Sequence, residues 1–390
     1  MERRRALVAA VRDGEAQRSV ARRFSVGLAT VQLWLRRAAN QPLDRVDWGD
    51  RPPIAARVRR TPIEIEDLVL EVRRTLREES VLGEYGAVAI RRELEARDDL
   101  PGPLPAVRTI ARILERRGVL DARRRIRRPA PPPGWYLPDV RARRTELDSF
   151  DAIDGLYLKG GLALDILTGI SLHGGLPAAW PSSGLRSGQV VDMLEEHWRA
   201  FGRPGYAQFD NDARFIGGAS VPDSIGVVIR FCLAAGVVPV FAPPRETGFQ
   251  AAVEAFNGRW QQKLWVRFWD PSLEALQARS AAYIAASRLR AVERIEAAPA
   301  RSPISPDQRF DRRAPAAGRL VFLRRTTDSG GVTILNRRYP VDRLWVHRLV
   351  RAELDIDTRR IDVFALRRRD PDHQPHVAQL DFNPPDRWFR

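Results

Sequence analysis

The hydrophobic and polar positions of the first 120 residues predict two small helical units. Apolar residues recur at helical spacing between residues 1 and 40, and Gly14 and the turn Ser25–Gly27 separate three segments. A short turn between two amphipathic helices is typical of a helix-turn-helix. Three further helices are predicted after the helix-start signal Thr61-Pro62. We therefore expect a helix-turn-helix unit at 1–40, a linker at 41–60 and a second helix-turn-helix or winged-helix-like unit at 61–120.

Residues 121–145 lose the helical pattern and become rich in proline and arginine. Eight arginines and two acids occur in this segment, together with the run from Pro129 to Pro133. Proline favours a semi-rigid, extended spacer. We expect a basic linker, which either follows the phosphates of a nucleic acid or is simply solvated. The arginines that would contact phosphate are Arg124, Arg125, Arg127 and Arg128.

The central part of the chain, residues 146–300, has the pattern of an α/β domain. Three consecutive strand-like segments are followed by alternating helices and strands, which predicts a mixed sheet covered on both faces. The expected strands are 146–153, 158–166, 169–174, 206–210 and 237–241. The expected helices are about 187–201, 222–235, 248–266 and 272–295.

Short strands separated by turn residues return between residues 318 and 366. This spacing favours a small β-barrel, and the proline-rich, charged stretch 367–390 is expected to be a poorly ordered tail. The chain is therefore expected to be multidomain. Its fold class would be N-terminal all-α helix-turn-helix units, a central α/β mixed sheet and a C-terminal small β-barrel.

Composition narrows the classes of protein that fit this pattern. The 390 residues carry a net charge of +16, which points to a polyanionic partner, although a solvated basic surface would give the same balance. No apolar stretch has the length of a membrane span, and the charged start does not resemble a signal peptide. We expect no membrane partner and a cytoplasmic location. Cys232 is the only cysteine, so an internal disulfide is excluded and a Cys/His zinc site has almost no ligands.

Three acids stand where rigid elements would hold them. Asp148 lies inside a strand-like stretch on the same face as Phe150, Asp210 ends another apolar strand, and Glu254 lies within a predicted helix. Carboxylates aimed at a common point are what two divalent metal ions need for phosphodiester cleavage. The acids near Asp148 that could serve in its place are Asp151, Asp154 and Asp165.

The segments around the second and third acids also resemble a known family. Phe209-Asp210-Asn211, then Pro243-Pro244, then Val253-Glu254 followed by Asn257-Gly258 are similar to the integrase catalytic core of insertion-sequence transposases. The resemblance covers about residues 140–300. It implies an RNase H-like fold in which Asp148, Asp210 and Glu254 form a catalytic DDE triad and hold two Mg²⁺ or Mn²⁺ ions.

Three departures from the family pattern concern residues near these acids. The interval between Asp210 and Glu254 is longer than usual, and the extra residues are expected in the loop from Ile216 to Asp223. Asp212 replaces the family's usual glycine, and Gln261 stands where a basic residue is common. Asp212 adds an acid near the metal ions, and Asn257 is expected on the same side of its helix as Glu254. Both are possible accessory residues.

The expected function is that of a DDE transposase acting on double-stranded DNA. It would bind the terminal inverted repeats of its element, cleave their 3′ ends and transfer the strands, as a homodimer or higher synaptic oligomer in a bacterial-type nucleoid. The alternative is a DNA-binding regulator derived from a transposase with an idle core; a structure-selective nuclease would lack the two upstream units. Polar residues early in a recognition helix read bases and arginines hold phosphates. The candidates are Thr30, Gln32, Arg36 and Arg37 in the first unit and Arg108, Thr109 and Arg112 in the second.

Overall fold

The computed structural model describes residues 2–50, 61–120, 133–217, 223–312 and 315–383, and the chain divides into two compact units, Met1–Pro62 and Ile63–Arg390. The first unit contains α1 (Glu2–Arg12), α2 (Gln17–Arg23) and α3 (Leu28–Ala38). Its core is closed by Trp34 and Trp48, whose ring centroids lie 5.8 Å apart. The chain therefore remains packed on this unit through residue 48, beyond the start of the expected linker.

The second unit begins with three helices, α4 (Ile63–Glu79), α5 (Ala87–Glu95) and α6 (Val107–Arg116). Each turns an apolar stripe toward the same small core, which includes Val69, Ile90 and Ile110. Glu66 on α4 is buried and forms ion pairs with Arg116 and Arg117 of α6 or just after it.

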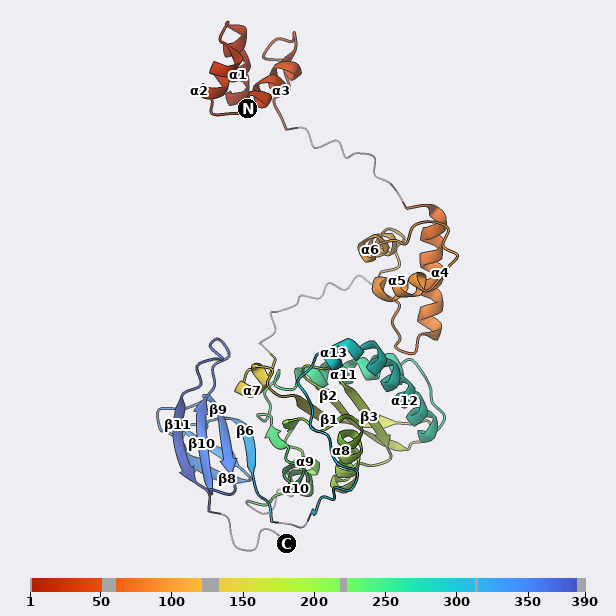
Figure 1. The fold of residues 1–390 in the computed structure, drawn as a ribbon, viewed down its shortest axis with the longest axis vertical. Helices are drawn as coiled ribbons and strands as arrows, with labels where there is room; N and C mark the ends of the chain where they lie inside the picture. The colour runs from red at the N-terminus through yellow and green to blue at the C-terminus, as the bar shows by residue number, and fades with distance from the viewer. Residues whose placement is uncertain (1, 51–60, 121–132, 218–222, 313–314, 384–390) are drawn as a thin grey trace. The chain divides into compact units, whose positions relative to one another are not determined.

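Strands from the middle and the end of the chain form one mixed sheet (Figure 1). Among the described residues its order is β11-β10-β9-β6-β5-β4-β1-β2-β3. β1, β2 and β3 are antiparallel neighbours, whereas β4 lies parallel to β1 and β5 parallel to β4. These helices and the large mixed sheet are compatible with an RNase H-like core. The strand bounds are β1 Leu147–Tyr157, β2 Ala163–Ser171, β3 Pro177–Ser182, β4 Tyr206–Phe209, β5 Val238–Phe241, β6 Arg319–Arg325, β9 Leu349–Asp355, β10 Arg360–Ala365 and β11 His376–Asp381.

The two faces of the sheet carry different helices. On one face, α8 (Ser187–Phe201) and α10 (Val227–Ala234) share a core with Phe150 of β1. On the other, α11 (Ala251–Trp260) and α12 (Leu273–Arg290) share a core with Ile153. Alternate side chains of a strand point to opposite faces, so the parity of a β1 residue decides which helices it meets. Short helical segments complete the domain: α9 Ala213–Ile216, the π-helical turn Gln261–Trp265 and α13 Val292–Glu296.

The expected third strand, 169–174, is misplaced. β2 continues through Ser171, and β3 follows at 177–182 with Pro177 and Pro181 inside it. Proline argues against an inner strand, but β3 lies at the edge of the sheet, where a missing N–H is tolerated.

The C-terminal strands do not form the expected separate barrel. β6 pairs in parallel with β5, with Val240 beside Val321 and Phe241 beside Phe322, and β9 to β11 extend the same sheet. The described strands end at β11 as an open edge, with a hairpin of β7 (Gly331–Ile334) and β8 (Arg337–Pro340) beside them. The run from Leu320 to Leu323 is buried on both faces, because β6 is an inner strand.

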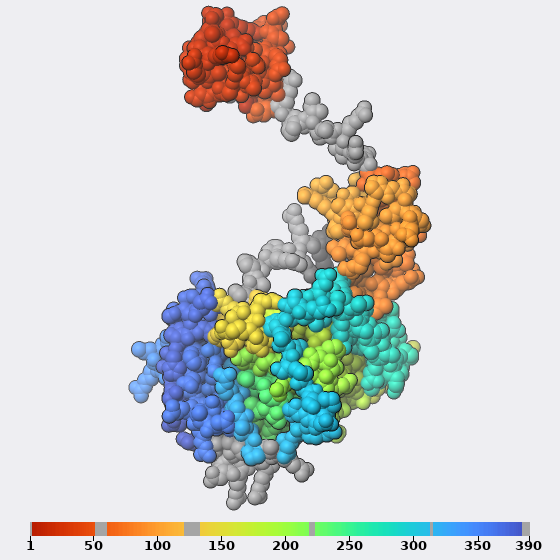
Figure 2. Space-filling view, viewed as in Figure 1, coloured from red at the N-terminus to blue at the C-terminus, as the bar shows by residue number. Residues whose placement is uncertain are grey.

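Two segments expected to be linker or tail are part of the folded domain. Trp135, Tyr136 and Leu137 are buried, and α7 (Pro138–Arg141) follows them. Figure 2 shows this yellow segment against the blue C-terminal strands, where Arg351 donates to the carbonyl oxygen of Tyr136 at 2.9 Å. The expected tail likewise contains β11, paired with β10. Arg124, Arg125, Arg127 and Arg128 lie outside the described residues.

None of the helices formed by the described residues is both long and apolar enough to cross a membrane.

Candidate active site

The parallel strands β1 and β4 place two aspartates side by side. Ser149 is in register with Gln208, and the two side chains lie 3.5 Å apart on the same face. Asp151 and Asp210 each follow two positions later, so strand alternation keeps both on that face. Both side chains are partly exposed at the carboxyl end of β4, an edge where open α/β sheets commonly carry their sites.

Helix α11, which carries the third acid, contacts Asp151 directly. Asn257, buried on this helix, donates a 2.8 Å hydrogen bond from Nδ2 to Oδ2 of Asp151 and accepts one of 2.6 Å from the Thr168 hydroxyl. Glu254 lies three residues earlier, on the same side of the helix, and its side chain is exposed. The accessory position Asn257 therefore orients Asp151 and fixes α11 against β1 and β2.

The charges of Asp210 and Glu254 act on Asp151. Burial, together with the charges of Asp210 and Glu254, raises the pKa of Asp151 to about 6. Burial also raises the pKa of Asp210, against the opposing effect of the Asp212 backbone N–H, which donates to Oδ1 of Asp210 at 3.0 Å. Among the described residues no Lys or Arg forms an ion pair with any of the three. The positive charge of Arg214, which is paired with Asp212 and Asp154, offsets part of the Asp210 charge through space without bonding to it.

Asp212, the second accessory position, belongs to a neighbouring ion-pair group. Its carboxylate caps α9 by accepting from the Arg214 backbone N–H at 2.8 Å, and it also pairs with the Arg214 guanidinium. Arg214 in turn binds both oxygens of Asp154 at 2.8 Å. These contacts occupy Asp212 and Asp154, which are two of the acids considered from sequence.

The expectation for Asp148 has to be corrected. Asp148 has the opposite parity to Asp151 and lies on the α8 face, where both of its oxygens accept from Arg301, at 2.8 and 2.6 Å, and Oδ2 also accepts from Trp198 at 3.1 Å. Burial alone would raise the pKa of this carboxyl, but Arg301 holds it below its ordinary value. The structure therefore places Asp151, not Asp148, on the face that carries Asp210 and packs against the helix of Glu254.

The donor set of this site fits hard divalent cations. Mg²⁺ and Mn²⁺ prefer oxygen ligands such as carboxylates, which Asp151, Asp210 and Glu254 supply. Within the ranges that the structure describes, no three His, Cys, Asp or Glu side chains are already drawn together as a metal-binding group. The exposed Glu254 would have to swing toward the aspartates to close around an ion.

The proposed DNA-contacting positions are available to solvent in different degrees. On α3, Gln32 and Arg36 are exposed and Thr30 is half-buried, whereas Arg37 stacks on Trp34 and donates to the Gly49 carbonyl oxygen. On α6, Arg108 and Arg112 are exposed one turn apart and Thr109 is half-buried. Their contacts with DNA remain a prediction.

The sequence matches no protein-family model and no curated protein. Solved structures that overlap the chain include retroviral integrase catalytic cores. A bovine immunodeficiency virus (BIV) integrase core has 14% identity, with 36% of this chain and 81% of that chain covered, and a TM-score of 0.28. A chain of a simian T-cell lymphotropic virus intasome has 14% identity, with 68% of this chain and 88% of that chain covered, and a TM-score of 0.35. An HTLV-2 integrase core, solved with magnesium, has 13% identity, with 35% of this chain and 82% of that chain covered, and a TM-score of 0.27. At these TM-scores the overlaps do not show which residues of this chain correspond to the residues of an integrase.

Proposed function

We propose that this chain is a metal-dependent DNA strand-transfer enzyme, a transposase of the DDE type, with Asp151, Asp210 and Glu254 as its catalytic acids. The observation that carries the proposal is that Asp151 in β1 and Asp210 after β4 lie on the same face of the sheet, beside helix α11, which carries Glu254 and contacts Asp151 through Asn257. Among the described residues no protein cation forms an ion pair with the three acids. Asp151 takes the place expected for Asp148.

The chain's own residues would position the acids before any ion binds. Asn257 holds Oδ2 of Asp151, and the Thr168 hydroxyl fixes the orientation of the Asn257 amide. The Asp212 backbone N–H holds Asp210. Because two of the three acids lie on β1 and directly after β4, their spacing is set by the sheet. Divalent ions bound there would lower the pKa of the attacking water and offset charge on the phosphate.

The remainder of the chain would supply DNA recognition. The helical units at residues 2–50 and 61–120 would bind the ends of the element, with Gln32, Arg36, Arg108 and Arg112 as exposed contact residues. Joining two DNA ends requires two active sites, so a homodimer or larger synaptic assembly is part of the proposal. A net charge of +16 suits this polyanionic partner.

The test uses full-length protein, Mg²⁺ or Mn²⁺, and duplex DNA carrying the inverted repeats that flank the coding sequence. Strand cleavage and joining are expected for the wild type, and loss of both for Asp151→Asn, Asp210→Asn and Glu254→Gln. Asp154→Asn is the matched control, because Asp154 is a nearby exposed acid already paired with Arg214. Unchanged cleavage by the three variants would overturn the catalytic assignment. Specific DNA binding without cleavage by the wild type would favour the regulator.

A further inference from the structure

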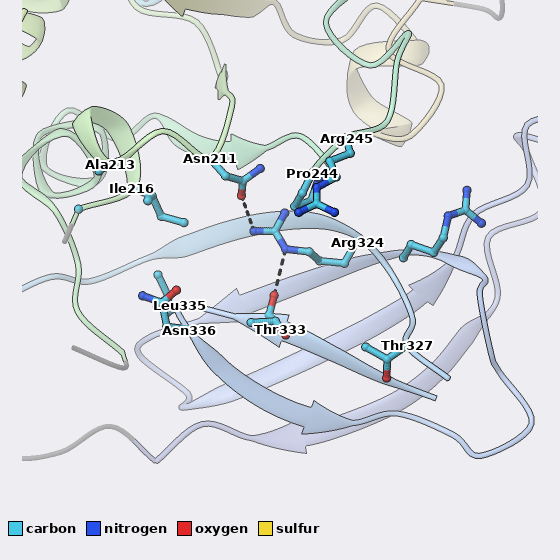
Figure 3. A pocket seen from close by; sticks show the side chains of 12 residues that line it. Asn211, Ala213, Ile216, Pro244, Arg245, Arg324, Thr327, Thr333, Leu335 and Asn336 are labelled. Carbon is cyan, nitrogen blue, oxygen red and sulfur yellow. Dashed lines mark hydrogen bonds between the residues drawn. The ribbon is translucent and has the colours of Figure 1, made fainter. Parts of the chain in front are cut away.

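A second feature lies directly beside the acidic site, in a pocket of about 480 Å³ between the Asp210 loop and the C-terminal strands (Figure 3). Its described lining includes Asn211, the loop residues Pro244 and Arg245, and Arg324 and Arg325 at the end of β6. Three of the residues that line it are arginines, and none is an acid. The pocket is therefore a concave, positively charged surface.

Arg324 is the unusual member of this pocket, because it is only 7% exposed and has no carboxylate partner among the described residues. Its guanidinium donates to neutral oxygens. The acceptors are the Thr333 carbonyl at 3.0 Å, the Leu323 carbonyl at 2.9 Å, the Ala242 carbonyl at 3.2 Å, the Phe241 carbonyl at 3.4 Å and the Asn211 side chain at 2.7 Å. Figure 3 shows the guanidinium between Asn211 and Thr333. A buried charge is costly unless an opposite charge offsets it, and burial lowers the pKa of Arg324 to about 10.

The rim adds a second arginine that no described residue neutralises. Arg245 is exposed, forms no ion pair with any described residue, and is held by a left-handed backbone with φ of 61°. Arg325 differs, because Glu246 pairs with its guanidinium at 2.9 Å. One buried and one exposed arginine thus face a shared space whose described lining contains no anion.

We propose that this pocket binds a backbone phosphate of the DNA strand whose scissile phosphate lies at Asp151, Asp210 and Glu254, with Arg324 at its base and Arg245 at its rim. The proposal rests on the proposed function and adds a second contact along the same strand. Phosphates repeat about every 3.4 Å of helix axis along a strand, so a strand held at Asp210 carries further phosphates past Asn211. Arginine is suited to such a site because its planar fork matches phosphate oxygens.

The test measures binding of a random-sequence fluorescent DNA duplex to the full chain in the Glu254→Gln background with chelator present. Arg245→Gln is expected to weaken binding about fivefold and to reduce the slope of log affinity against log salt by about one. The matched control is Arg359→Gln, because Arg359 is an exposed turn arginine with a similar φ of 55° and lies outside the pocket lining. Arg324→Gln, checked for folding by thermal unfolding, is expected to behave like Arg245→Gln.

Each result supports or overturns the pocket independently of the chemistry. An affinity and salt slope for Arg245→Gln equal to those of Arg359→Gln would overturn it, even if the wild type cleaves DNA. An Arg245-dependent slope in a protein that cleaves no DNA would support the pocket and refute the catalytic proposal. Inorganic phosphate alone is the second probe: Arg245-dependent stabilisation by phosphate, with DNA binding unaffected, would identify a free-anion site and contradict a DNA contact.

Discussion

Asp148 and Asp151 lie three residues apart on β1, and the same Asp→Asn change is expected to affect them in opposite ways. The Asp148 side chain is 1% exposed and that of Arg301 12%, and two charge-assisted hydrogen bonds join them. Removing one charge leaves the other uncompensated in the interior, which costs about 3–5 kcal/mol. Because asparagine retains the shape, we expect Asp148→Asn to lower the free energy of unfolding by about 3 kcal/mol.

Asp151→Asn is expected to leave stability unchanged or to increase it. A carboxyl whose pKa is raised to about 6 by burial and by Asp210 and Glu254 is disfavoured in its ionised form at neutral pH. A neutral amide removes this repulsion, so the free energy of unfolding should rise by at most about 3 kcal/mol. DNA cleavage by this variant should nevertheless be lost.

Urea unfolding followed by tryptophan fluorescence, with DNA cleavage assayed on the same preparations, separates the two roles. The double variant Asp148→Leu/Arg301→Met should recover most of the lost stability, since replacing a whole buried ion pair by apolar residues is often close to neutral. The reasoning is refuted if Asp148→Asn unfolds like the wild type but cleaves no DNA. It is equally refuted if Asp151→Asn remains active.

Three further outcomes are expected. Asn257→Ala should lower cleavage about 10- to 100-fold and raise the metal concentration for half-maximal activity, because the carboxyl it orients is released; an unchanged metal requirement would contradict this role. Burial lowers the pKa of His197 to about 4, so the folded protein holds this side chain in its neutral form. The contribution to the free energy of unfolding is complete above about pH 6.5, and up to about 3 kcal/mol of it is lost as the pH falls from about 6.5 to 4. Urea unfolding across this range should show the decline, and His197→Phe should remove most of it. Gly169→Ala places a Cβ 2.5 Å from the Phe150 ring and should cost about 1–3 kcal/mol, whereas Gly188→Ala, with open space around it, should be neutral or slightly stabilising by thermal unfolding.

Local pattern was sufficient for most helices and several strands. The helices near residues 187–201 and 272–295 and the strands ending near Phe209 and Phe241 follow directly from periodicity, because each buries an apolar stripe or run of its own. The edge strand with Pro177 was missed, since tolerance of proline depends on where a strand lies in the sheet. The barrel was wrong for a related reason: pairing of β6 with β5 joins segments about 80 residues apart, and no local signal reports such a partner.

The acids show most directly what sequence alone determined. Residue types and spacing led to the prediction of Asp210 and Glu254 as site residues and to Asp151 as one substitute for Asp148, because strand ends and helix faces follow from periodicity. Only the tertiary structure decided between the two aspartates. Successive side chains of β1 point to opposite faces of the sheet, so Asp148 and Asp151 lie on different faces. The face that α11 covers is set by the packing of Ile153 with Val253 and Trp260. Asp148 therefore pairs with Arg301 in the interior, and Asp151 lies on the face that carries Asp210 and packs against α11.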